Sequence, residues 1–478
     1  MSLLAQYPQL KIIQNIALRQ KVSVYLVGGF LRDFLLDQPK MDFDFAVEKN
    51  ALRIARALAR KIKGAYVLLD EAHGCARVVK KYEGAAYTFD FADFRAKTFR
   101  QDLSHRDFTI NTFSINLAEV SDHNGIKDVL KDLKKGKRDL QSSTIRMVSK
   151  SIFKEDPLRM LRAFSLQAVL GFKIEAKTLA QIKKDKELIR EVSYERITVE
   201  LFKIFESNRA AQNLKAMDRI GLLEQVIPQI RVMYGCKQGT YHHLDVWPHS
   251  LESVDQLEKL LEELKEHQDI RSYLNEILGS DRSRRALLKL AMALHDICKP
   301  DTRKKEDNGR ISFHGHEHVG KNIVRHIVKL LKLSTRERHI LEDIVEMHLR
   351  PGYLSNFKAP SERAIFRFFR DAKDEAASIL LLSLADQRST RGPMTTEADQ
   401  RHHEKICMSL IGRYFDMKKE KPFVRLIDGN DLIRKLKLKP SPLFSKILSE
   451  VDEKQMLGKI TTKQEALGLA EKIADKGL

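Results

Sequence analysis

The sequence predicts an α+β protein in which a small mixed sheet with helices is followed by a long helical remainder. Two patterns lead to this prediction. Residues 22–27 form an apolar run rich in strand-forming side chains, and residues 42–45 alternate between polar and apolar, which is typical of strands. From residue 156 onward, apolar side chains recur at the three- and four-residue spacing of a helix buried on one face.

The composition is that of a globular protein with a polyanionic partner. The 478 residues are enough for several domains, and 43% of them are hydrophobic and 31% charged. The net charge of +20 and the pI near 9.6 favour a partner such as RNA. The alternative is a basic surface that serves solubility alone.

Other features exclude several classes of protein. No run of about 18 uncharged apolar residues is present, so no membrane span is expected. The first residues lack the charged start and long apolar core of a signal peptide. The four cysteines are scattered without a CxxC pair, which fits a reducing compartment and argues against a cysteine zinc site. We therefore expect a cytoplasmic protein.

An Asp-x-Asp pair lies on the second expected strand. Because residues two apart in a strand point to the same face, Asp42 and Asp44 project together, while Phe43 and Phe45 turn into the core. Paired carboxylates supply the hard oxygen ligands that Mg²⁺ prefers. The alternative is a solvated strand face or a turn, which an isolated Asp-x-Asp usually marks.

Two glycines precede this pair, at the start of a helix-like segment over residues 30–36. Free backbone N–H groups and the helix dipole at such a turn attract anions, so Gly28 and Gly29 are candidate phosphate ligands. Arg32 can add a bidentate phosphate contact. A strand–turn–helix–strand unit with these groups favours metal-dependent phosphate chemistry.

A third carboxylate is expected on a strand over residues 87–91. Asp90 faces away from Phe89 and Phe91 in that strand, which makes it a candidate for the same site. The alternative is a surface residue of the strand. A basic amphipathic helix at 50–63 and a strand at 65–69 complete the expected N-terminal elements.

A further candidate pair begins the first long helix. Asp156 and Pro157 predict a helix start with Asp156 as its N-cap, and Gly171 predicts its end. Asp156 and Arg159 are three residues apart, so they are neighbours on a helix. A carboxylate and a guanidinium can distinguish cytosine and adenine by their pairing edges. The alternative is a cap residue that pairs with the arginine.

A second set of candidate ligands is spread over the helical part of the chain. Histidine and carboxylate side chains from several helices can bind one or two metal ions. The candidates are His249, His295, Asp296, His316, His348 and Asp386. Surface residues or neighbours of the ligands are the simpler explanation for His242, His243, His314 and His318.

Four sequence words occur in the order and roughly the spacing of one protein family: GGFLRDFLLD, DFDF, RDFTIN at 106–111 and EDPLRMLRAF from residue 155. They resemble the class II tRNA nucleotidyltransferase and bacterial poly(A) polymerase family, which includes CCA-adding enzymes. The resemblance implies a polymerase-β-like nucleotidyltransferase head. It also implies template-independent addition of nucleotides to the tRNA 3′ end from CTP and ATP, with two Mg²⁺ ions.

The resemblance implies roles for individual residues. The ions would be held by Asp42 and Asp44, with Asp90 as a further catalytic carboxylate. Phosphate and sugar contacts would come from Gly28, Gly29, Arg32, Arg106, Asp107 and Asn111. Base selection would fall to Asp156 and Arg159, supported by Glu155 and Arg162. A helix cap with a salt bridge is the alternative for Arg106, Asp107 and Asn111.

Two departures from the family pattern concern the head. The family word RRDFT is HRDFT here, so His105 replaces an arginine, which puts one phosphate or ribose contact in question. The connection over residues 93–105 is shorter than the flexible loop of many enzymes that add the whole CCA end. That shortness resembles enzymes that add only CC.

The words ALHDICKP and FHGHEHVG resemble the HD phosphohydrolase domain. The resemblance implies a second divalent metal, such as Mn, Ni, Fe or Mg, bound by the six candidate ligands. Some tRNA nucleotidyltransferases carry this domain with phosphodiesterase or phosphatase activity. In others it is a structural body that holds tRNA.

The resemblance divides the chain into four parts. A nucleotidyltransferase head over 1–140 precedes a neck over 141–208 with the nucleotide-selecting helix. An HD-type helical body over 209–395 and a helical tail over 396–478 follow, and residues 396–422 are expected as a linker or an exposed helix. The tail lysines suit RNA phosphates, although an exposed basic face without RNA is the alternative.

The expected partners are tRNA, CTP and ATP, without a membrane, and the protein is expected as a monomer or homodimer. Addition of CCA, of CC alone and of A alone stays open, and so does poly(A) polymerase, against which the histidine-rich body argues. Two other classes are an HD-domain metallophosphohydrolase with a decayed head and a tRNA-binding protein without catalysis. The intact Asp42, Asp44, Asp156 and Arg159 argue against both.

Overall fold

The computed structural model describes residues 2–82, 84–123, 125–420 and 423–477. The chain divides into two compact units. The first comprises Met1–Ile204 and Arg219–Val226, and the second Phe205–Asp218 and Ile227–Leu478. Among the described residues, no helix combines the length and the apolar composition needed to cross a lipid bilayer.

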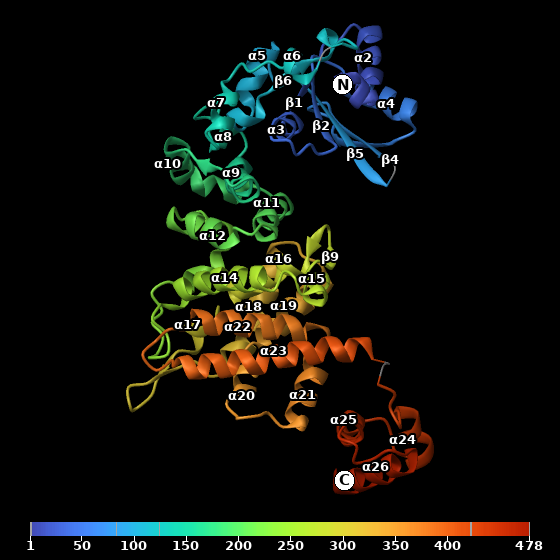
Figure 1. Cartoon of the computed structure of the whole chain (residues 1–478), viewed down its shortest axis with the longest axis vertical. Helices are drawn as coiled ribbons and strands as arrows, with labels where there is room; N and C mark the ends of the chain where they lie inside the picture. The colour runs from blue at the N-terminus through green and yellow to red at the C-terminus, as the bar shows by residue number, and fades with distance from the viewer. Residues whose placement is uncertain (1, 83, 124, 421–422, 478) are drawn as a thin grey trace. The chain divides into compact units, whose positions relative to one another are not determined.

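The first unit is built on one mixed six-stranded sheet (Figure 1). Its strands are β1 (Val24–Val27), β2 (Asp42–Val47), β3 (Ala65–Asp70), β4 (Cys75–Tyr82), β5 (Ala85–Asp93) and β6 (Ser114–Asn116). They lie in the order β3-β4-β5-β2-β1-β6. β2 and β5 run parallel, and all the other neighbours run antiparallel. The expected sheet with its accompanying helices is thus confirmed.

Some helices of the first unit pack on this sheet, such as α3 (Gly29–Leu35) against β2 and α4 (Ala51–Ile62) against β4 and β5, and others follow the sheet along the chain. The remaining helices are α1 (Leu3–Gln6), α2 (Pro8–Gln20), α5 (Phe99–Asp102), α6 (Ile126–Val129), α7 (Gly136–Gln141), α8 (Ile152–Glu155), α9 (Leu158–Leu170), α10 (Ala176–Asp185), α11 (Tyr194–Glu206) and α13 (Leu223–Val226). Short 3₁₀ helices are η1 (Leu103–His105), η2 (Thr109–Asn111), η3 (Leu117–Glu119) and η4 (Lys186–Glu191). Two very short strands, β7 (Thr144–Ile145) and β8 (Lys173–Ile174), pair beside α9.

The core of the sheet fixes where its acidic side chains point. Phe43 pairs in register with Phe89, and Phe45 with Phe91. Their rings stack with centroids 5.3 and 4.7 Å apart, and all four side chains are buried. Because side chains alternate along a strand, the aspartates between these rings face the opposite side of the sheet. The alternation expected from the sequence is confirmed.

The start of α9 differs from the sequence prediction. Asp156 is not the N-cap of a helix: its backbone N–H closes the short helix α8 on the carbonyl of Ile152 at 3.1 Å. Pro157 takes the cap position, and the Asp156 carboxylate accepts a long, 3.3 Å hydrogen bond from the N–H of Leu158 in α9. Gly171 ends α9 in the left-handed conformation, as expected.

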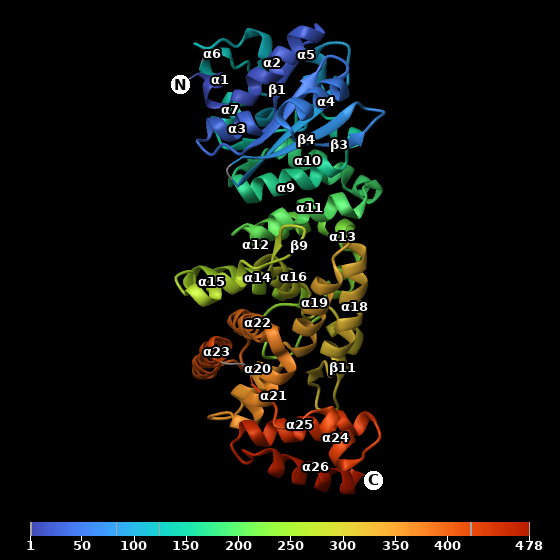
Figure 2. The ribbon, with the colours of Figure 1, turned by 90° about the vertical axis from the view of Figure 1, so that its right-hand side faces the viewer.

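The second unit is helical apart from two short strand pairs, β9 (Ile277–Gly279) with β10 (Arg282–Ser283) and β11 (Lys304–Lys305) with β12 (Ile311–Ser312). Figure 2 shows the same helices from a second side. The helices are α12 (Ala210–Arg219), η5 (Pro228–Met233), α14 (Val246–Glu263), α15 (Gln268–Leu274), α16 (Arg284–Leu294), α17 (Lys299–Thr302), α18 (His316–Leu330), α19 (Thr335–Met347), α20 (Arg350–Ser355), α21 (Glu362–Ala372), η6 (Lys373–Glu375), α22 (Ala376–Ser389), α23 (Glu397–Lys419), α24 (Gly429–Leu436), α25 (Pro442–Met456) and α26 (Lys463–Gly477).

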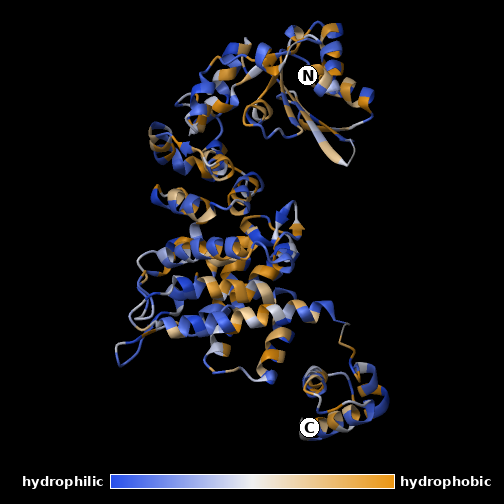
Figure 3. Ribbon diagram, viewed as in Figure 1, coloured by the Kyte–Doolittle hydropathy of each residue, from blue (hydrophilic) through white to orange (hydrophobic). Residues whose placement is uncertain are grey.

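α22 is the central helix of the second unit. Its residues 376–385 are all buried, and it contacts α14, α16 and α23. In Figure 3, hydrophobic residues, in orange, lie on the inner helices of this unit, and hydrophilic residues, in blue, are frequent on the outer ones. Burial on all sides explains why this helix is apolar around its whole circumference.

The segment expected as a linker or exposed helix is the long helix α23, and one of its sides is buried. His403, Cys407, Leu410, Ile411 and Tyr414 lie on that side, which packs against α20 and α22. Residues 421 and 422 of the expected segment lie outside the described residues. The last three helices enclose a small core of their own that includes Leu432, Ile447 and Ala470.

Candidate functional site

A cavity of about 290 Å³ lies in the first unit, where the start of α3, the strands β2 and β5, and α9 meet. Its lining includes most of the nucleotide-site residues predicted from the sequence, namely Gly28, Gly29, Asp44, Asp90, Arg106, Asp107, Asn111, Asp156, Arg159 and Arg162. Three predicted residues, Arg32, Asp42 and Glu155, are not part of the lining. The cavity joins segments that are more than a hundred residues apart.

Gly28 lies against the carboxylate of Asp44. Its φ is +83°, in the region that favours glycine. A Cβ at this position would also clash with the Asp44 carboxylate oxygen. The turn therefore needs glycine for its backbone and for the space beside the acid.

Asp44 is the carboxylate best suited to a cation. Burial is the main cause that raises the pKa of Asp44 to about 6; neighbouring Asp42 and Asp90 raise it further, and Arg106 opposes them. Asp42 is exposed and accepts a hydrogen bond from the Thr88 hydroxyl. A divalent cation fits this set, because its charge would compensate the half-buried Asp44 carboxylate among like charges and it prefers oxygen ligands.

Asp90 faces the same side but is already paired. Both of its oxygens accept hydrogen bonds from Arg77 on β4, at 2.7 and 2.6 Å. The same hydrogen bonds raise the pKa of Arg77. Each oxygen keeps a second lone pair, so Asp90 can still contact a metal ion, but Arg77 already offsets its charge.

A hydrogen-bonded network supports one wall of the cavity. Arg32 donates to Asp33 and to the Asn111 side chain, each at 2.7 Å, and is itself buried. Asn111 donates to Asp107 at 3.0 Å, and Asp107 pairs with Arg162 at 3.0 Å. Because its donors are used within the protein, Arg32 orients Asn111 here, and its predicted phosphate contact stays a prediction.

Arg106 is the unsatisfied donor of the cavity. Its Nε is buried and has no hydrogen-bond partner in the described part of the chain. Burial lowers the pKa of Arg106, against the opposing charges of Asp102 and Asp44. An anion that enters the cavity would supply the missing acceptor.

The two predicted base readers do not pair with each other. The Asp156 carboxylate pairs with Arg196 of α11 at 2.9 Å. Arg159 donates to the backbone carbonyls of His105, at 2.6 Å, and Ile152, at 3.3 Å. Both side chains therefore line the cavity with separate supports, unlike the cap and ion pair considered as the alternative.

The short connection after β5 is packed against the sheet. Phe99 of α5 stacks on Tyr25 of β1 with centroids 3.7 Å apart and a 6° angle between the rings. The Asp102 carboxylate accepts the backbone N–H of Arg95 at 2.9 Å. These contacts hold the segment that leads to Arg106.

The predicted metal ligands of the second unit converge. They form two groups, His249, His295 and Asp386, and Asp296, His316 and His348, in each of which the donor atoms lie within 4.8 Å of one another. Asp296 joins them, since one oxygen is 3.2 Å from Nε2 of His295 and the other 3.3 Å from Nε2 of His316.

Backbone contacts orient the histidines toward the centre of this cluster. In His295, His316 and His348, Nδ1 lies 2.7–2.8 Å from the carbonyl oxygen of the residue three positions earlier. Nε2 thereby faces the other ligands: those of His316 and His348 lie 3.2 Å apart, and that of His295 is buried, with no hydrogen bond of good geometry among the described residues. This arrangement is the usual support of metal-binding histidines, so one or two divalent cations fit the cluster.

Residues around the cluster complete it. Lys299 is buried and contacts Asp296 at 2.6 Å and Gln238 at 2.7 Å. The ring of His242 lies 4.7 Å from that of His249, and burial lowers the pKa of His242 to about 3. His242 is therefore a neighbour of the ligands, as expected, whereas His314 is exposed.

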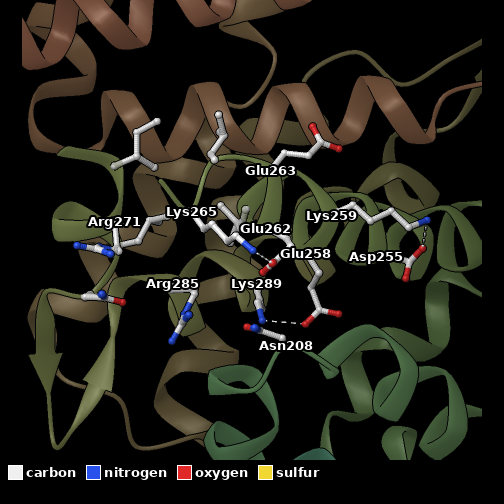
Figure 4. A pocket seen from close by; sticks show the side chains of 15 residues that line it. Asn208, Asp255, Glu258, Lys259, Glu262, Glu263, Lys265, Arg271, Arg285 and Lys289 are labelled. Carbon is white, nitrogen blue, oxygen red and sulfur yellow. Dashed lines mark hydrogen bonds and ion pairs between the residues drawn. The ribbon is translucent and has the colours of Figure 1, made fainter. Parts of the chain in front are cut away.

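A larger cavity of about 680 Å³, beside α14, α15 and α16, was not expected from the sequence (Figure 4). Three acidic side chains in it pair with lysines: Asp255 with Lys259, Glu258 with Lys289, and Glu262 with Lys265. Arg271 and Arg285 point in different directions. The charges are thus used mainly in internal pairs.

Sequence reasoning missed three supporting residues: Arg77, Thr88 and Lys299. Lys299 follows Asp296 at a spacing of three, which could have identified it as a neighbour on one turn. Arg77 and Thr88 contact their aspartates across strands, so their roles depend on the register of β4, β5 and β2. No pattern along the chain encodes that register.

Three family models match consecutive parts of the chain. "Poly A polymerase head domain" matches residues 24–146, and "Probable RNA and SrmB- binding site of polymerase A" matches residues 171–233. "HD domain" matches residues 246–391.

Curated relatives match over nearly the whole length. The A-adding tRNA nucleotidyltransferase of Deinococcus radiodurans is 30% identical, covering 94% of this chain and 95% of that one. The CC-adding tRNA nucleotidyltransferase of Thermus thermophilus is 27% identical, covering 93% and 92%.

Solved structures share the fold. The Thermotoga maritima CCA-adding enzyme complexed with tRNA has a TM-score of 0.60 at 20% identity, covering 98% of this chain and 95% of that one. A CCA-adding enzyme in complex with ATP has a TM-score of 0.62 at 21% identity, covering 96% and 91%.

Proposed function

The chain belongs to the class II tRNA nucleotidyltransferase family with an HD domain and is a nucleotidyltransferase of the CCA-adding type, and we propose that the cavity of its first unit joins C or A to the tRNA 3′ end from CTP or ATP. One observation supports this most: Asp44, a half-buried carboxylate with a raised pKa, and Arg106, a guanidinium whose Nε has no hydrogen-bond partner among the described residues, line the same cavity. A nucleoside triphosphate with its metal ion carries the complementary charges.

We propose that Asp42 and Asp44 hold Mg²⁺. When bound, the metal would lower the pKa of the primer 3′-hydroxyl and neutralise the triphosphate and the leaving pyrophosphate. The backbone at Gly28 and Gly29 and the side chain of Arg106 would bind the phosphates. The chain's own contribution is then mainly positioning and fixed charge.

We propose that Asp156 and Arg159 select the base. Their separate supports hold a carboxylate acceptor and a guanidinium donor at the same cavity. That pair suits the amino group and the ring acceptors of cytosine and adenine. Asp107 and Asn111, which the network with Arg32 and Arg162 orients, would contact the sugar.

The direct test uses Mg²⁺ and three tRNAs, which end before CCA, after one C and after both Cs. CTP and ATP are given separately and together. Incorporation of C, of A or of both confirms the proposal and identifies the subtype, since CC-adding and A-adding relatives both match along the whole chain. Incorporation into none of the three tRNAs would contradict it, and long A tails would indicate a poly(A) polymerase.

A second activity is favoured by the converging ligands of the second unit. We propose that His249, His295, Asp296, His316, His348 and Asp386 bind one or two divalent cations and hydrolyse a phosphoester. The ligand set, with imidazole and carboxylate donors, suits Mn, Ni, Fe or Mg.

This second proposal has a test of its own. Bound metal is counted by elemental analysis in the wild type, in Asp296→Ala and in the control His314→Ala, and phosphate release from phosphoesters is measured. Asp296→Ala should lose metal and hydrolysis while nucleotide addition persists, because Asp296 joins both ligand groups. Equal metal content in all three proteins would contradict the proposal.

A further inference from the structure

We infer that His105 is a positioning residue for Arg159 and thereby helps to set which nucleotide the first-unit cavity accepts. The inference rests on the proposed function and extends it to a residue outside the predicted nucleotide-binding set. It comes from the contacts that His105 makes with two other residues.

His105 contacts the neck with both its backbone and its side chain. Its carbonyl oxygen accepts a 2.6 Å hydrogen bond from Arg159. Its ring Nδ1 lies 3.0 Å from Glu155 Oε2. His105 ends η1 and Glu155 ends α8, so this one residue connects segments about 50 positions apart.

Arg159 depends on these contacts for its orientation. Its guanidinium donates to the carbonyls of His105 and Ile152 and lies 3.6 Å from Glu155. The residue is only 6% exposed, yet it lines the cavity. Because a guanidinium is planar, two directed hydrogen bonds fix the plane in which its remaining N–H groups can meet a base.

Glu155 fixes the other end of this contact. One of its oxygens accepts from the Ser151 hydroxyl at 2.8 Å, while the other faces His105 and Arg159. The His105 ring links the end of η1 to α8. Besides Arg159, the donor to the His105 carbonyl is Arg95, at a long 3.5 Å, so loss of the ring would let this carbonyl shift. Arg159 would then rotate, and its fit to a base edge would change.

The contact can be removed without loss of the fold. The His105 and Glu155 side chains are 40% and 30% exposed, and ion pairs at such exposure contribute little to stability. A role limited to stability would thus leave the kinetics nearly unchanged, whereas a positioning role would not.

The experiment compares His105→Ala, His105→Asn, Glu155→Gln and the double variant His105→Ala/Glu155→Gln, as full-length chains. KM and kcat for CTP and ATP are measured on the tRNA end that the wild type extends. His105→Ala should raise KM for the accepted nucleotide about 5- to 10-fold. The ratio of kcat/KM for the accepted nucleotide to kcat/KM for the other nucleotide should fall toward 1.

Two comparisons separate positioning from a general defect. His105→Asn should restore most of the discrimination, since the asparagine amide can take the place of ring Nδ1 beside Glu155. The double variant should match His105→Ala, because the change at Glu155 acts on a contact that His105→Ala has already removed. His123→Ala, an exposed histidine of the same unit outside the cavity lining, is the control and should match the wild type.

Unchanged discrimination in His105→Ala, an equal fall of kcat for both nucleotides with constant KM, or additive single effects would overturn the inference. Thermal unfolding of each variant confirms that folded proteins are compared. If the alanine variant is unfolded, nucleotide discrimination is compared between Glu155→Gln, His105→Asn and the wild type instead. A wild type that adds no nucleotide would contradict the proposed function itself, which is a different result.

Discussion

Asp44 on β2 and Asp90 on β5 lie directly opposite each other in the parallel pairing of the two strands, but their surroundings differ. Arg77 donates two hydrogen bonds to Asp90. Burial dominates at Asp44 and raises its pKa to about 6. Asp44 and Asp90 therefore differ although they share one face of the sheet. The charge of Asp90 is compensated by Arg77, whereas a bound cation would stabilise the charged form of Asp44.

Asp90→Asn should lower nucleotide transfer only moderately. Because Arg77 already compensates Asp90, we expect kcat to fall about 10-fold, much less than for loss of an essential metal ligand. The measurement is the single-turnover rate on tRNA. A loss as large as that of Asp44→Asn would instead show that Asp90 is an essential metal ligand despite its pair with Arg77.

Gly28→Ala should abolish most activity, because the new Cβ would displace the Asp44 carboxylate. Gly84→Ala is a matched control, since Gly84 has a similar φ of +86° but no atom within 4 Å of the added Cβ. Both variants should lose about 1 kcal/mol of stability from the left-handed backbone. Only Gly28→Ala should also lose about 100-fold in kcat/KM. Equal activity of the two variants would contradict the role of the Gly28–Asp44 contact.

Lys289→Met should destabilise the second unit. Lys289 is 1% exposed and pairs with Glu258, which also accepts the backbone N–H groups of Ala210 and Ala211. Removal of one partner leaves a buried charge, which costs about 3–5 kcal/mol of unfolding free energy.

Lys259→Met provides the comparison for Lys289→Met. The Lys259–Asp255 pair is exposed, so its loss should change the unfolding free energy by less than about 1 kcal/mol. Urea unfolding monitored by circular dichroism measures both values. If the two variants lose similar amounts of unfolding free energy, burial of Lys289 is not the reason why its ion pair contributes to stability.

Local patterns along the chain predicted the parts of this protein that repeat with a strand or helix period. The alternation of Phe43 and Phe45 with Asp42 and Asp44 predicted which side of β2 is buried, and Gly171 marked the end of α9. Such patterns depend only on residues close together in the sequence, so they can be recognised before the fold is known.

Contacts across the fold were beyond these patterns. Asp156 was expected to cap a helix, and an ion pair with Arg159 was the alternative to base selection; instead, Asp156 pairs with Arg196, about 40 residues away. The hydrogen bond from Arg32 to Asn111, 79 positions later, was not expected either, and the predicted phosphate contact of Arg32 stays a prediction. The partner of a polar side chain depends on which residues the fold brings close to it. Local spacing along the sequence does not contain that information.

The most direct test of the account is Mg²⁺-dependent incorporation of labelled CTP or ATP into tRNA by the wild type and by Asp44→Asn, with tRNA binding measured in parallel. We predict that incorporation falls at least about 1,000-fold in Asp44→Asn while tRNA binding is unchanged, because the variant lacks the proposed metal ligand and keeps the rest of the protein. Wild-type incorporation by Asp44→Asn would contradict the assignment of the first-unit cavity as the site of nucleotide transfer.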